Sequence, residues 1–302
     1  MTLFVKMQLT FLGTSAMVPT KERNHSAALI SYSTEGILID CGEGTQRQMK
    51  IAGIKPSKVT KILISHWHGD HVLGIPGLIQ TLAKNGYDKV LEIYGPEGTK
   101  NRMENMFKAF SFEDKIETKI YEITKKRFFE GKDFFLEALP LEHGITTIGF
   151  SFIEKDKRRI SIDAVRKMGI PDGPLLGKLQ LGKSITFKEK KITPEQATYV
   201  VKGKKLSFIA DTVPCNNALE LAMNSDILVC EATYADKLEE KAAEYMHMTS
   251  KQAGLLANQA KAKKLILTHF SQRYKTMGEI EDDAKDVFSN TICAYDFMKL
   301  KI

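Results

Sequence analysis

Hydrophobic and polar positions along this chain follow two patterns, one typical of strands and one typical of helices. Short apolar or alternating runs, often rich in β-branched residues and bounded by turn formers, predict strands. Segments with apolar residues three or four positions apart predict helices. The runs that predict strands are 3–12, 27–32, 36–39, 59–65, 90–94, 116–123, 134–141, 206–210, 227–230, 265–267 and 292–300. The segments that predict helices are 43–53, 77–84, 97–110, 216–224, 250–261 and 278–288.

The order of these elements predicts an α/β fold in a single domain over residues 1–302. Strands that alternate with helices form sheets whose faces the helices cover. Each half of the chain begins with hairpin strands and then alternates strand and helix, which allows two stacked sheets with helices outside each. Two helix ends carry clear signals. Gly53 fits the position after the first helix, and Thr249 with Gln252 forms a capping-box pattern.

The most informative short segment is His66-Trp67-His68-Gly69-Asp70-His71, directly after the predicted strand 59–65. It holds three of the seven histidines of the chain and an aspartate. Imidazole and carboxylate groups are the usual ligands of zinc and similar divalent ions. So many ligands on one short segment indicate two adjacent metals that share it. The alternative is a surface loop that is rich in histidine by chance.

Three more candidate ligands follow predicted strands in the same way. His143 comes after 134–141, Asp211 after 206–210 and His269 after 265–267. In α/β folds, the carboxyl ends of parallel strands meet at the edge where ligands bind. The sequence therefore predicts one site that combines seven side chains: His66, His68, Asp70, His71, His143, Asp211 and His269. Taken singly, each histidine could be structural and Asp211 could cap a helix.

Seven ligands suit two ions with one shared carboxylate. A natural division gives His66, His68 and His143 to one ion and Asp70, His71 and His269 to the other, with Asp211 between them. A water shared by two cations would ionise near neutral pH. Zinc is expected, although the same ligands accept manganese or iron.

The basic charge of the chain is concentrated in one segment. Residues 154–191 hold eleven Lys or Arg against five Asp or Glu, a net +6 in a chain whose net charge is +7. The centre of the segment is rich in Gly and Pro, so it is predicted to form a flexible inserted arm. An exposed basic arm makes phosphate contacts without reading sequence. A solvated lysine-rich loop is the simpler alternative.

Other features favour a reducing compartment and no membrane. The four cysteines are widely spaced and include no C-x-x-C pair, which argues against a disulfide framework. No run approaches the roughly 18 apolar residues of a membrane span, and residues 1–6 do not begin a secretory signal. We therefore expect a cytoplasmic protein.

Several motifs together resemble the short form of the tRNase Z (ribonuclease Z) family, within the metallo-β-lactamase superfamily. Besides the hexad, they are Pro19–Asn24, Asp40–Gln46, Ala210–Thr212, Glu231–Thr233, His247-x-Thr249 and Leu267–Ser271. The resemblance implies an αββα four-layer sandwich, two zinc ions per subunit, a homodimer and an inserted exosite arm for tRNA binding, here 154–191. The family often has His and Ser where this chain has Cys230 and Met248. That departure leaves the treatment of a CCA end open.

The implied reaction is endonucleolytic removal of the 3′ trailer from precursor tRNA. Phosphodiester hydrolysis would leave a tRNA 3′-OH and a trailer 5′-phosphate. His247, just before the capping box, is predicted to act as general acid with Glu231 as its orienter. The family suggests that Asp70 also acts as base. The predicted RNA contacts are Lys21, Arg23, Asn24, Arg158, Arg159, Lys178 and Lys183.

Two other functions compete with this one. A hydrolase of small phosphodiesters or other esters would share the metal site but has no evident need for the basic arm. A catalytically inactive RNA-binding module would need the arm and not the complete set of ligands.

Overall fold

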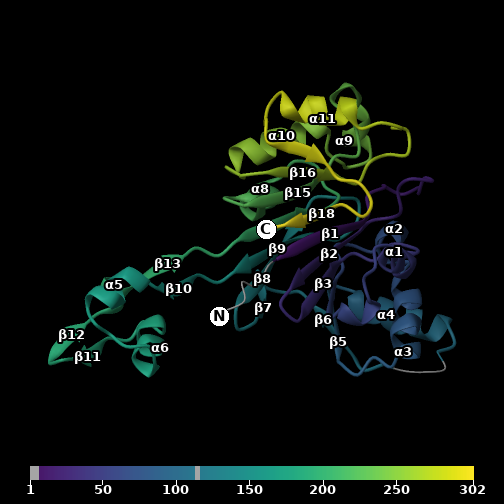
Figure 1. The fold of residues 1–302 in the computed structure, drawn as a ribbon. Coiled ribbons are helices and arrows are strands. Elements are labelled where there is room, and N and C mark those ends of the chain that lie inside the picture. The colour runs from purple at the N-terminus through teal and green to yellow at the C-terminus, as the bar shows by residue number, and fades with distance from the viewer. Residues whose placement is uncertain (1–6, 113–115) are drawn as a thin grey trace. The chain divides into compact units, whose positions relative to one another are not determined.

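The computed structural model describes residues 7–112 and 116–302, and it contains two seven-stranded sheets (Figure 1). The strand orders are β18-β1-β2-β3-β4-β5-β6 and β17-β16-β15-β14-β9-β8-β7. Helices cover the outer face of each sheet, so the predicted αββα fold class is confirmed. The first four residues of the predicted strand 3–12 lie outside the described part of the chain.

The first sheet begins antiparallel and continues parallel. Strand β1 pairs antiparallel with β2 and β2 with β3, while β3 to β6 are parallel. Its strands are β1 (Gln8–Gly13), β2 (Ala27–Tyr32), β3 (Glu35–Ile39), β4 (Lys61–Leu63), β5 (Leu91–Gly95), β6 (Thr118–Glu122) and β18 (Lys299–Lys301). The elements beside it are α1 (Thr45–Ile51), η1 (Pro56–Lys58), α2 (Gly69–Val72), α3 (Ile75–Lys84) and α4 (Thr99–Ala109). Buried aliphatic side chains of α1, α3 and α4 form one core with this sheet.

The second sheet repeats the design with parallel strands β14 to β17. Its strands are β7 (Arg127–Glu130), β8 (Phe134–Leu141), β9 (Thr147–Glu154), β14 (Lys205–Ile209), β15 (Ile227–Glu231), β16 (Leu265–Thr268) and β17 (Thr291–Cys293). The elements beside it are α8 (Asn216–Ala222), η2 (Asp236–Leu238), α9 (Glu239–Glu244), α10 (Ser250–Gln259) and α11 (Gly278–Lys285). Strands β7 and β9 and helix α9 have no counterpart among the predicted elements.

Large aromatic side chains fill the space between the sheets. Tyr32 of β2 and Phe152 of β9 are buried, and their ring centroids lie 5.2 Å apart. Such an edge-to-face pair joins the inner faces of both sheets and stabilises them beyond simple burial. The two sheets therefore share one apolar layer, and their strand ends face the same edge.

The predicted terminal strand 292–300 is wrong as a single element. The structure divides it into β17, which pairs with β16, and β18, which pairs antiparallel with β1 of the other sheet. The connection crosses between sheets, where Asp296 accepts hydrogen bonds from the Asn24 backbone and from Gln48 Nε2, both at 2.8 Å. The C-terminal segment thus adds one strand to each sheet and links the two sheets. The local hydrophobic pattern does not reveal this division.

The predicted helix ends at Gly53 and Thr249 are confirmed. Gly53 follows α1 with φ +70°, a conformation that favours glycine because it lacks a Cβ. Thr249 and Gln252 form both hydrogen bonds of a capping box at the start of α10. The strand predicted over 59–65 is shorter, since β4 ends at Leu63. The last two residues of the predicted strand, Ile64 and Ser65, instead lead into the segment His66–His71.

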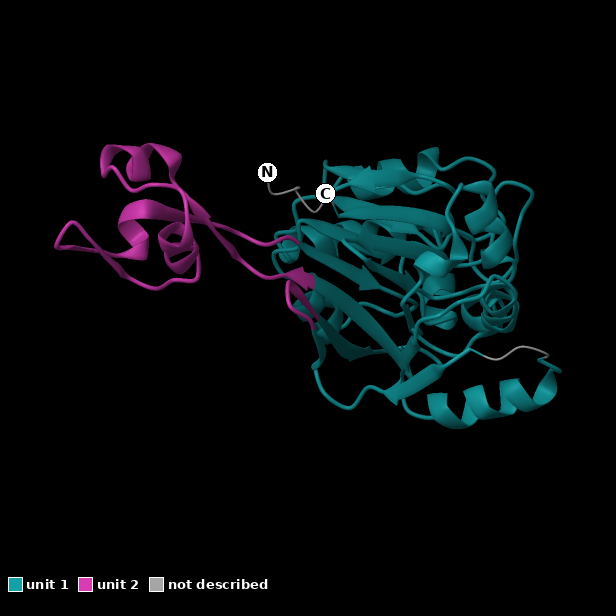
Figure 2. Cartoon of the chain, turned by 60° about the horizontal axis from the view of Figure 1, so that its bottom comes forward, with its two compact units in different colours: residues 1–130, 136–152, 205–302 teal, residues 131–135, 153–204 magenta. Residues whose placement is uncertain are grey.

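Residues 131–135 and 153–204 form a second compact unit (Figure 2). Strands β10 (Lys157–Ile160) and β13 (Thr198–Val201) pair antiparallel. Beyond them lie α5 (Ile162–Lys167), α6 (Pro174–Gln180), β11 (Ile185–Phe187), β12 (Lys190–Ile192) and α7 (Pro194–Ala197). This unit has its own small core of Val165, Ile170, Leu179, Ile185, Ile192 and Ala197. The predicted arm, 154–191, lies within it, and the unit continues to Lys204.

Candidate metal centre

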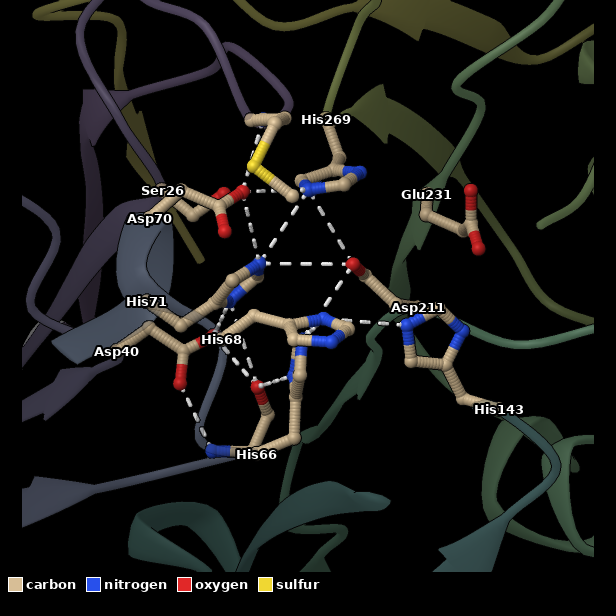
Figure 3. Close-up of polar contacts among 12 residues, drawn as sticks. Ser26, Asp40, His66, His68, Asp70, His71, His143, Asp211, Glu231 and His269 are labelled. Carbon is tan, nitrogen blue, oxygen red and sulfur yellow. Dashed lines mark hydrogen bonds and ion pairs between the residues drawn. The ribbon is translucent and has the colours of Figure 1, made fainter. Parts of the chain in front are cut away.

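The predicted ligands come from four strand ends of the first unit, residues 1–130, 136–152 and 205–302 (Figure 3). The hexad follows β4, and its last part forms the short helix α2. His143 follows β8, Asp211 follows β14 and His269 follows β16. Strand geometry explains this convergence, because each strand delivers its next residue to the shared edge.

Three histidines form the first cluster. His66 Nε2 lies 3.1 Å from His68 Nδ1, and His143 Nε2 lies 3.4 Å from the same atom. Asp211 Oδ2 approaches His66 Nε2 at 3.5 Å. All four residues have ligand atoms within 4.8 Å of one another.

The second cluster contains Asp70, His71 and His269. The Nε2 atoms of the two histidines are 3.3 Å apart, and Asp70 Oδ2 lies 3.4 Å from each of them. Asp211 also reaches this cluster, with Oδ1 at 3.4 Å from His269 Nε2 and Oδ2 at 3.6 Å from His71 Nε2. Asp211 therefore lies between the two groups of ligands.

These contacts fit divalent cations better than hydrogen bonds among the side chains alone. Asp40 accepts from His71 Nδ1. Thr233 Oγ1, whose proton goes to Glu231, accepts from His269 Nδ1. When both rings are neutral, the Nε2 atoms that face each other at 3.3 Å are therefore both acceptors, which a shared cation would satisfy. The Oδ1 atoms of Asp70 and Asp211 are buried and accept no hydrogen bond in the part of the chain that the structure describes. Orphaned buried acceptors beside converging imidazoles indicate a place for positive charge.

The electrostatics lead to the same conclusion. Burial lowers the pKa of His66 well below its ordinary value, and it also lowers the pKa of His68. Burial opposes ionisation of Asp211, but the surrounding histidines hold its pKa well below the ordinary value. Burial lowers the pKa of His71, but the carboxylates of Asp211 and Asp40 raise it well above its ordinary value, so the negative charge of the site favours a positive charge there. Neutral imidazoles and ionised carboxylates are the forms that bind metals, and a bound cation would take the place of the His71 proton. The site is thus compatible with divalent metal binding.

An outer layer holds the ligand rings in place. Asp40, with φ +56°, accepts hydrogen bonds from the Ser65 backbone and hydroxyl at 2.8 Å and lies 2.7 Å from His71 Nδ1. Thr233 Oγ1 lies 2.9 Å from His269 Nδ1, and the Met246 carbonyl lies 2.9 Å from His143 Nδ1. Such partners fix the orientation and tautomer of ligating histidines.

Sequence reasoning did not give Asp40, Thr233 or Met246 a role in the site. Asp40 carries a recoverable signal, since it directly follows a predicted strand, as the ligands do. Thr233 lies within the Glu231–Thr233 motif of the family, but nothing in the local sequence indicates that it contacts His269. Met246 acts through its backbone carbonyl, so its residue type carries no signal.

His247 and Glu231 form a close pair beside the clusters. His247 Nδ1 lies 3.0 Å and 3.1 Å from the two carboxylate oxygens of Glu231. Glu231 also accepts hydrogen bonds from the Thr212 backbone and the Thr233 hydroxyl, both at 2.7 Å. Burial lowers the pKa of His247, but the charge and hydrogen bond of Glu231 raise it to about 9. The pair can hold a proton next to the ligand atoms.

The predicted RNA contacts fall into two groups. Lys21 is exposed, whereas Arg23 is buried and donates to the Ser271 carbonyl at 3.3 Å. Asn24 Nδ2 donates to the Glu43 carbonyl at 2.8 Å. Arg23 and Asn24 therefore secure their own loop. The other four predicted contacts lie in the second unit: Arg158, Arg159, Lys178 and Lys183.

Comparison with known proteins identifies the family. Residues 7–167 match a family model described as anti-Pycsar protein Apyc1, and residues 179–270 match the beta-lactamase superfamily domain. The ribonuclease Z of Methanothermobacter thermautotrophicus is 39% identical over 98% of this chain and 97% of its own length. That of Bacillus licheniformis is 38% identical over 98% and 99%. The chain belongs to the ribonuclease Z family.

Solved structures agree with this assignment. The short form of human tRNase Z is 28% identical, with a TM-score of 0.70 and coverage of 97% of this chain and 98% of that one. The metallo-beta-lactamase fold protein YhfI from Bacillus subtilis has a TM-score of 0.72 at 19% identity, which supports the fold alone. The predicted family and enzyme class, a tRNA 3′-processing endoribonuclease of the metallo-β-lactamase superfamily, are thereby confirmed.

In this ribonuclease Z family member the ligands open to a cleft of about 380 Å³. Its lining includes His68, Asp70, His143, Asp211, His247 and His269. The ligand atoms are therefore accessible to a substrate, even though Asp70, Asp211 and His269 are buried. None of the described helices is long and apolar enough to cross a membrane.

Proposed function

We propose that the protein removes 3′ trailers from precursor tRNA by zinc-dependent phosphodiester hydrolysis, leaving a 3′-OH on the tRNA and a 5′-phosphate on the trailer. The observation that carries the proposal is the convergence of seven His and Asp side chains beside the His247–Glu231 pair. Near-complete coverage by ribonuclease Z relatives supports the RNA substrate over a small ester.

Two zinc ions per subunit would be held by the two clusters, with manganese or another divalent ion as an alternative. His66, His68 and His143 would hold one ion, and Asp70, His71 and His269 the other, with Asp211 shared. Bound divalent ions supply Lewis acidity, which activates water and neutralises charge on a phosphoryl group.

Proton transfers fall to the chain itself. His247 would donate a proton to the leaving ribose 3′-oxygen, because that oxygen is a poor leaving group when unprotonated. Glu231 would orient His247 through the hydrogen bond to Nδ1, which leaves Nε2 as the atom that faces substrate. Asp70 Oδ1, which lacks a hydrogen-bond donor among the described residues, is the atom suited to accept a proton from the attacking water.

The second unit would bind the tRNA body as an exosite arm. Its exposed basic side chains include Lys178 and Lys183. Arg158 is partly buried and donates to Thr198 Oγ1 at 2.9 Å. Arg158 and Arg159 would add positive charge along the same unit. Phosphate contacts of this kind recognise the shape of a folded RNA without reading its bases. Lys21 and the Arg23–Asn24 loop would contact the strand near the cut.

We also propose, from the family resemblance, that the protein is a homodimer in the cytoplasm. Light scattering coupled to size-exclusion chromatography tests the assembly. A mass of one chain, about 34 kDa, at micromolar concentration would contradict the dimer.

The decisive experiment maps product ends from trailer-bearing precursor tRNAs, with and without an encoded CCA. We expect one cut at the trailer boundary, with a 3′-OH and a 5′-phosphate, and loss of cleavage after chelation. Restoration by zinc and bound-metal analysis would establish the ion and its number. Products with a 2′,3′-cyclic phosphate, or chelator-resistant cleavage, would refute the mechanism.

A further inference from the structure

One wall of the cleft carries aromatic and cationic side chains that the proposed hydrolysis does not use. Tyr234, Tyr245, Lys241 and Arg273 line the same cavity as the ligands. Met17 and Val18 also line it and are 62% and 40% exposed. Exposed apolar surface next to a polar ligand cluster indicates a binding role, because a large solvated side chain contributes little to folding.

Tyr245 is the most exposed aromatic residue of this wall. It directly follows α9 and remains 52% exposed, although it lines a cleft. Lys241 Nζ lies over its ring, 5.7 Å from the centroid. A cation at that position attracts the ring and places positive charge beside it. The result is a partly solvated aromatic surface with a positive charge next to it.

The backbone on either side fixes this tyrosine relative to the ligands. The Met246 carbonyl binds His143 Nδ1 at 2.9 Å, and the His247 amide donates to the Ala242 carbonyl at 2.8 Å. Tyr245 therefore lies in a segment whose next residue contacts a ligand and whose second neighbour is the proposed acid. A group that stacks on its ring would occupy the same cleft as the ligand atoms.

The neighbouring tyrosine has a different role. Tyr234 is only 7% exposed, and the Arg273 guanidinium lies over its ring at 5.3 Å from the centroid. Arg273 itself is exposed and donates to Ser271 Oγ at 3.2 Å. Tyr234 thus packs beneath Arg273 and is buried, whereas Tyr245, with Lys241 over its ring, stays half exposed and offers surface to a ligand.

A flat, sequence-tolerant partner matches this surface. Nucleobases of single-stranded nucleic acid stack on exposed aromatic rings, and each stack changes affinity by roughly 10-fold to 100-fold. Every base has a π face, so such a contact tolerates trailers of different sequence. An adjacent lysine suits the phosphate that accompanies each base.

We propose that Tyr245, with Lys241 beside it, is a stacking platform for an unpaired nucleobase that flanks the scissile phosphate. It is a specificity-determining residue that selects single-stranded RNA at the cut. This inference rests on the proposed function, since the nucleobase belongs to a precursor tRNA.

The test combines protein variants with abasic substrates. Tyr245→Ala and Tyr245→Phe are compared under single-turnover conditions on a precursor tRNA and on versions with one abasic nucleotide at either position flanking the cut. Tyr245→Ala is expected to lower kcat/KM by about 10-fold to 100-fold on the normal precursor. Tyr245→Phe should keep most activity, because the ring is retained. Tyr295→Ala, at another exposed tyrosine outside the cleft lining, is the matched control.

The abasic substrates separate stacking from a structural effect. If Tyr245 stacks on a base, one abasic position lowers wild-type cleavage and has almost no further effect in Tyr245→Ala. If each abasic position reduced cleavage by the same factor in the wild type and in Tyr245→Ala, the proposal would be overturned. Bound-metal content and melting temperature are measured for each variant. If the proposed removal of 3′ trailers were itself wrong, the result would be distinguishable, because the wild-type protein would then leave the normal precursor uncut.

Discussion

The two compact units of this chain use charge in opposite ways. In the first, most of the ligand side chains are buried and held by an outer layer that includes Asp40 and Thr233. In the second, exposed lysines such as Lys178 and Lys183 spread over short elements around a small core. Buried charges interact strongly and depend on single partners, whereas exposed charges are screened by salt and act together.

This contrast indicates which property each unit controls. Chemistry needs fixed positions, because a developing charge is stabilised only by groups already in place. Recognition of a folded RNA needs many weak phosphate contacts, none of which has to be exact. Single substitutions should therefore be severe in the first unit and mild in the second. Substitutions in both units, ordered by the size of the expected effect, test that contrast.

The largest loss is expected for Asp211→Ala. Asp211 lies between both clusters, so its removal should take away bound metal and lower cleavage by about 10³-fold or more on every substrate. Single-turnover cleavage and metal analysis measure this. Asp286→Ala, at an exposed helix end, is the control and should behave as wild type. Full metal content with normal activity in Asp211→Ala would contradict the assigned position.

His247→Ala should lower cleavage of precursor tRNA by about 10²-fold to 10⁴-fold while bound metal is retained, because a general acid is removed. A p-nitrophenyl phosphodiester has a leaving group that needs no proton, so its hydrolysis should change little. Equal losses on both substrates would show that His247 does not protonate the leaving oxygen.

Asp40→Asn should have an intermediate effect of about 10-fold to 100-fold, the usual scale for an outer partner of a ligating histidine. The carboxylate that orients His71 is replaced by an isosteric amide. Metal affinity, measured by competition with a chelator, should fall together with cleavage. Unchanged affinity would mean that Asp40 only stabilises the fold around Ser65.

The smallest effect is expected for the double variant Lys178→Ala and Lys183→Ala in the second unit. Binding of precursor tRNA should weaken evenly across sequences, and the slope of log affinity against log salt should fall by about one for each phosphate that the variant no longer neutralises. Filter binding at several salt concentrations measures the slope. Hydrolysis of the p-nitrophenyl diester should stay at the wild-type rate.

Lys89→Ala with Lys108→Ala, two exposed lysines of the first unit, makes the same change in charge elsewhere. If this pair altered the salt slope as much as the pair in the second unit, net charge and not the second unit would account for binding.

Local sequence patterns were enough to predict a large part of this protein. Hydrophobic periodicity located most strands and helices, and the residues after four strands gave all seven candidate ligands. This succeeded because parallel strands end at one edge, so a local position carries long-range information. The capping box at Thr249 and the turn at Gly53 were predictable for a simpler reason, since their hydrogen bonds are local.

Which of these groups meet depends on the packing of distant segments. His71 and His269 are separated by 198 positions and lie 3.3 Å apart. The split of the last strand between two sheets, the burial of Arg23 and the roles of Asp40 and Thr233 also depend on packing and register. Tyr245 became notable only when the fold placed its exposed ring in the ligand cleft. The strand-end pattern predicted which ligands group together, but the other contacts depend on how the sheets pack and in which register, and no local pattern encodes those.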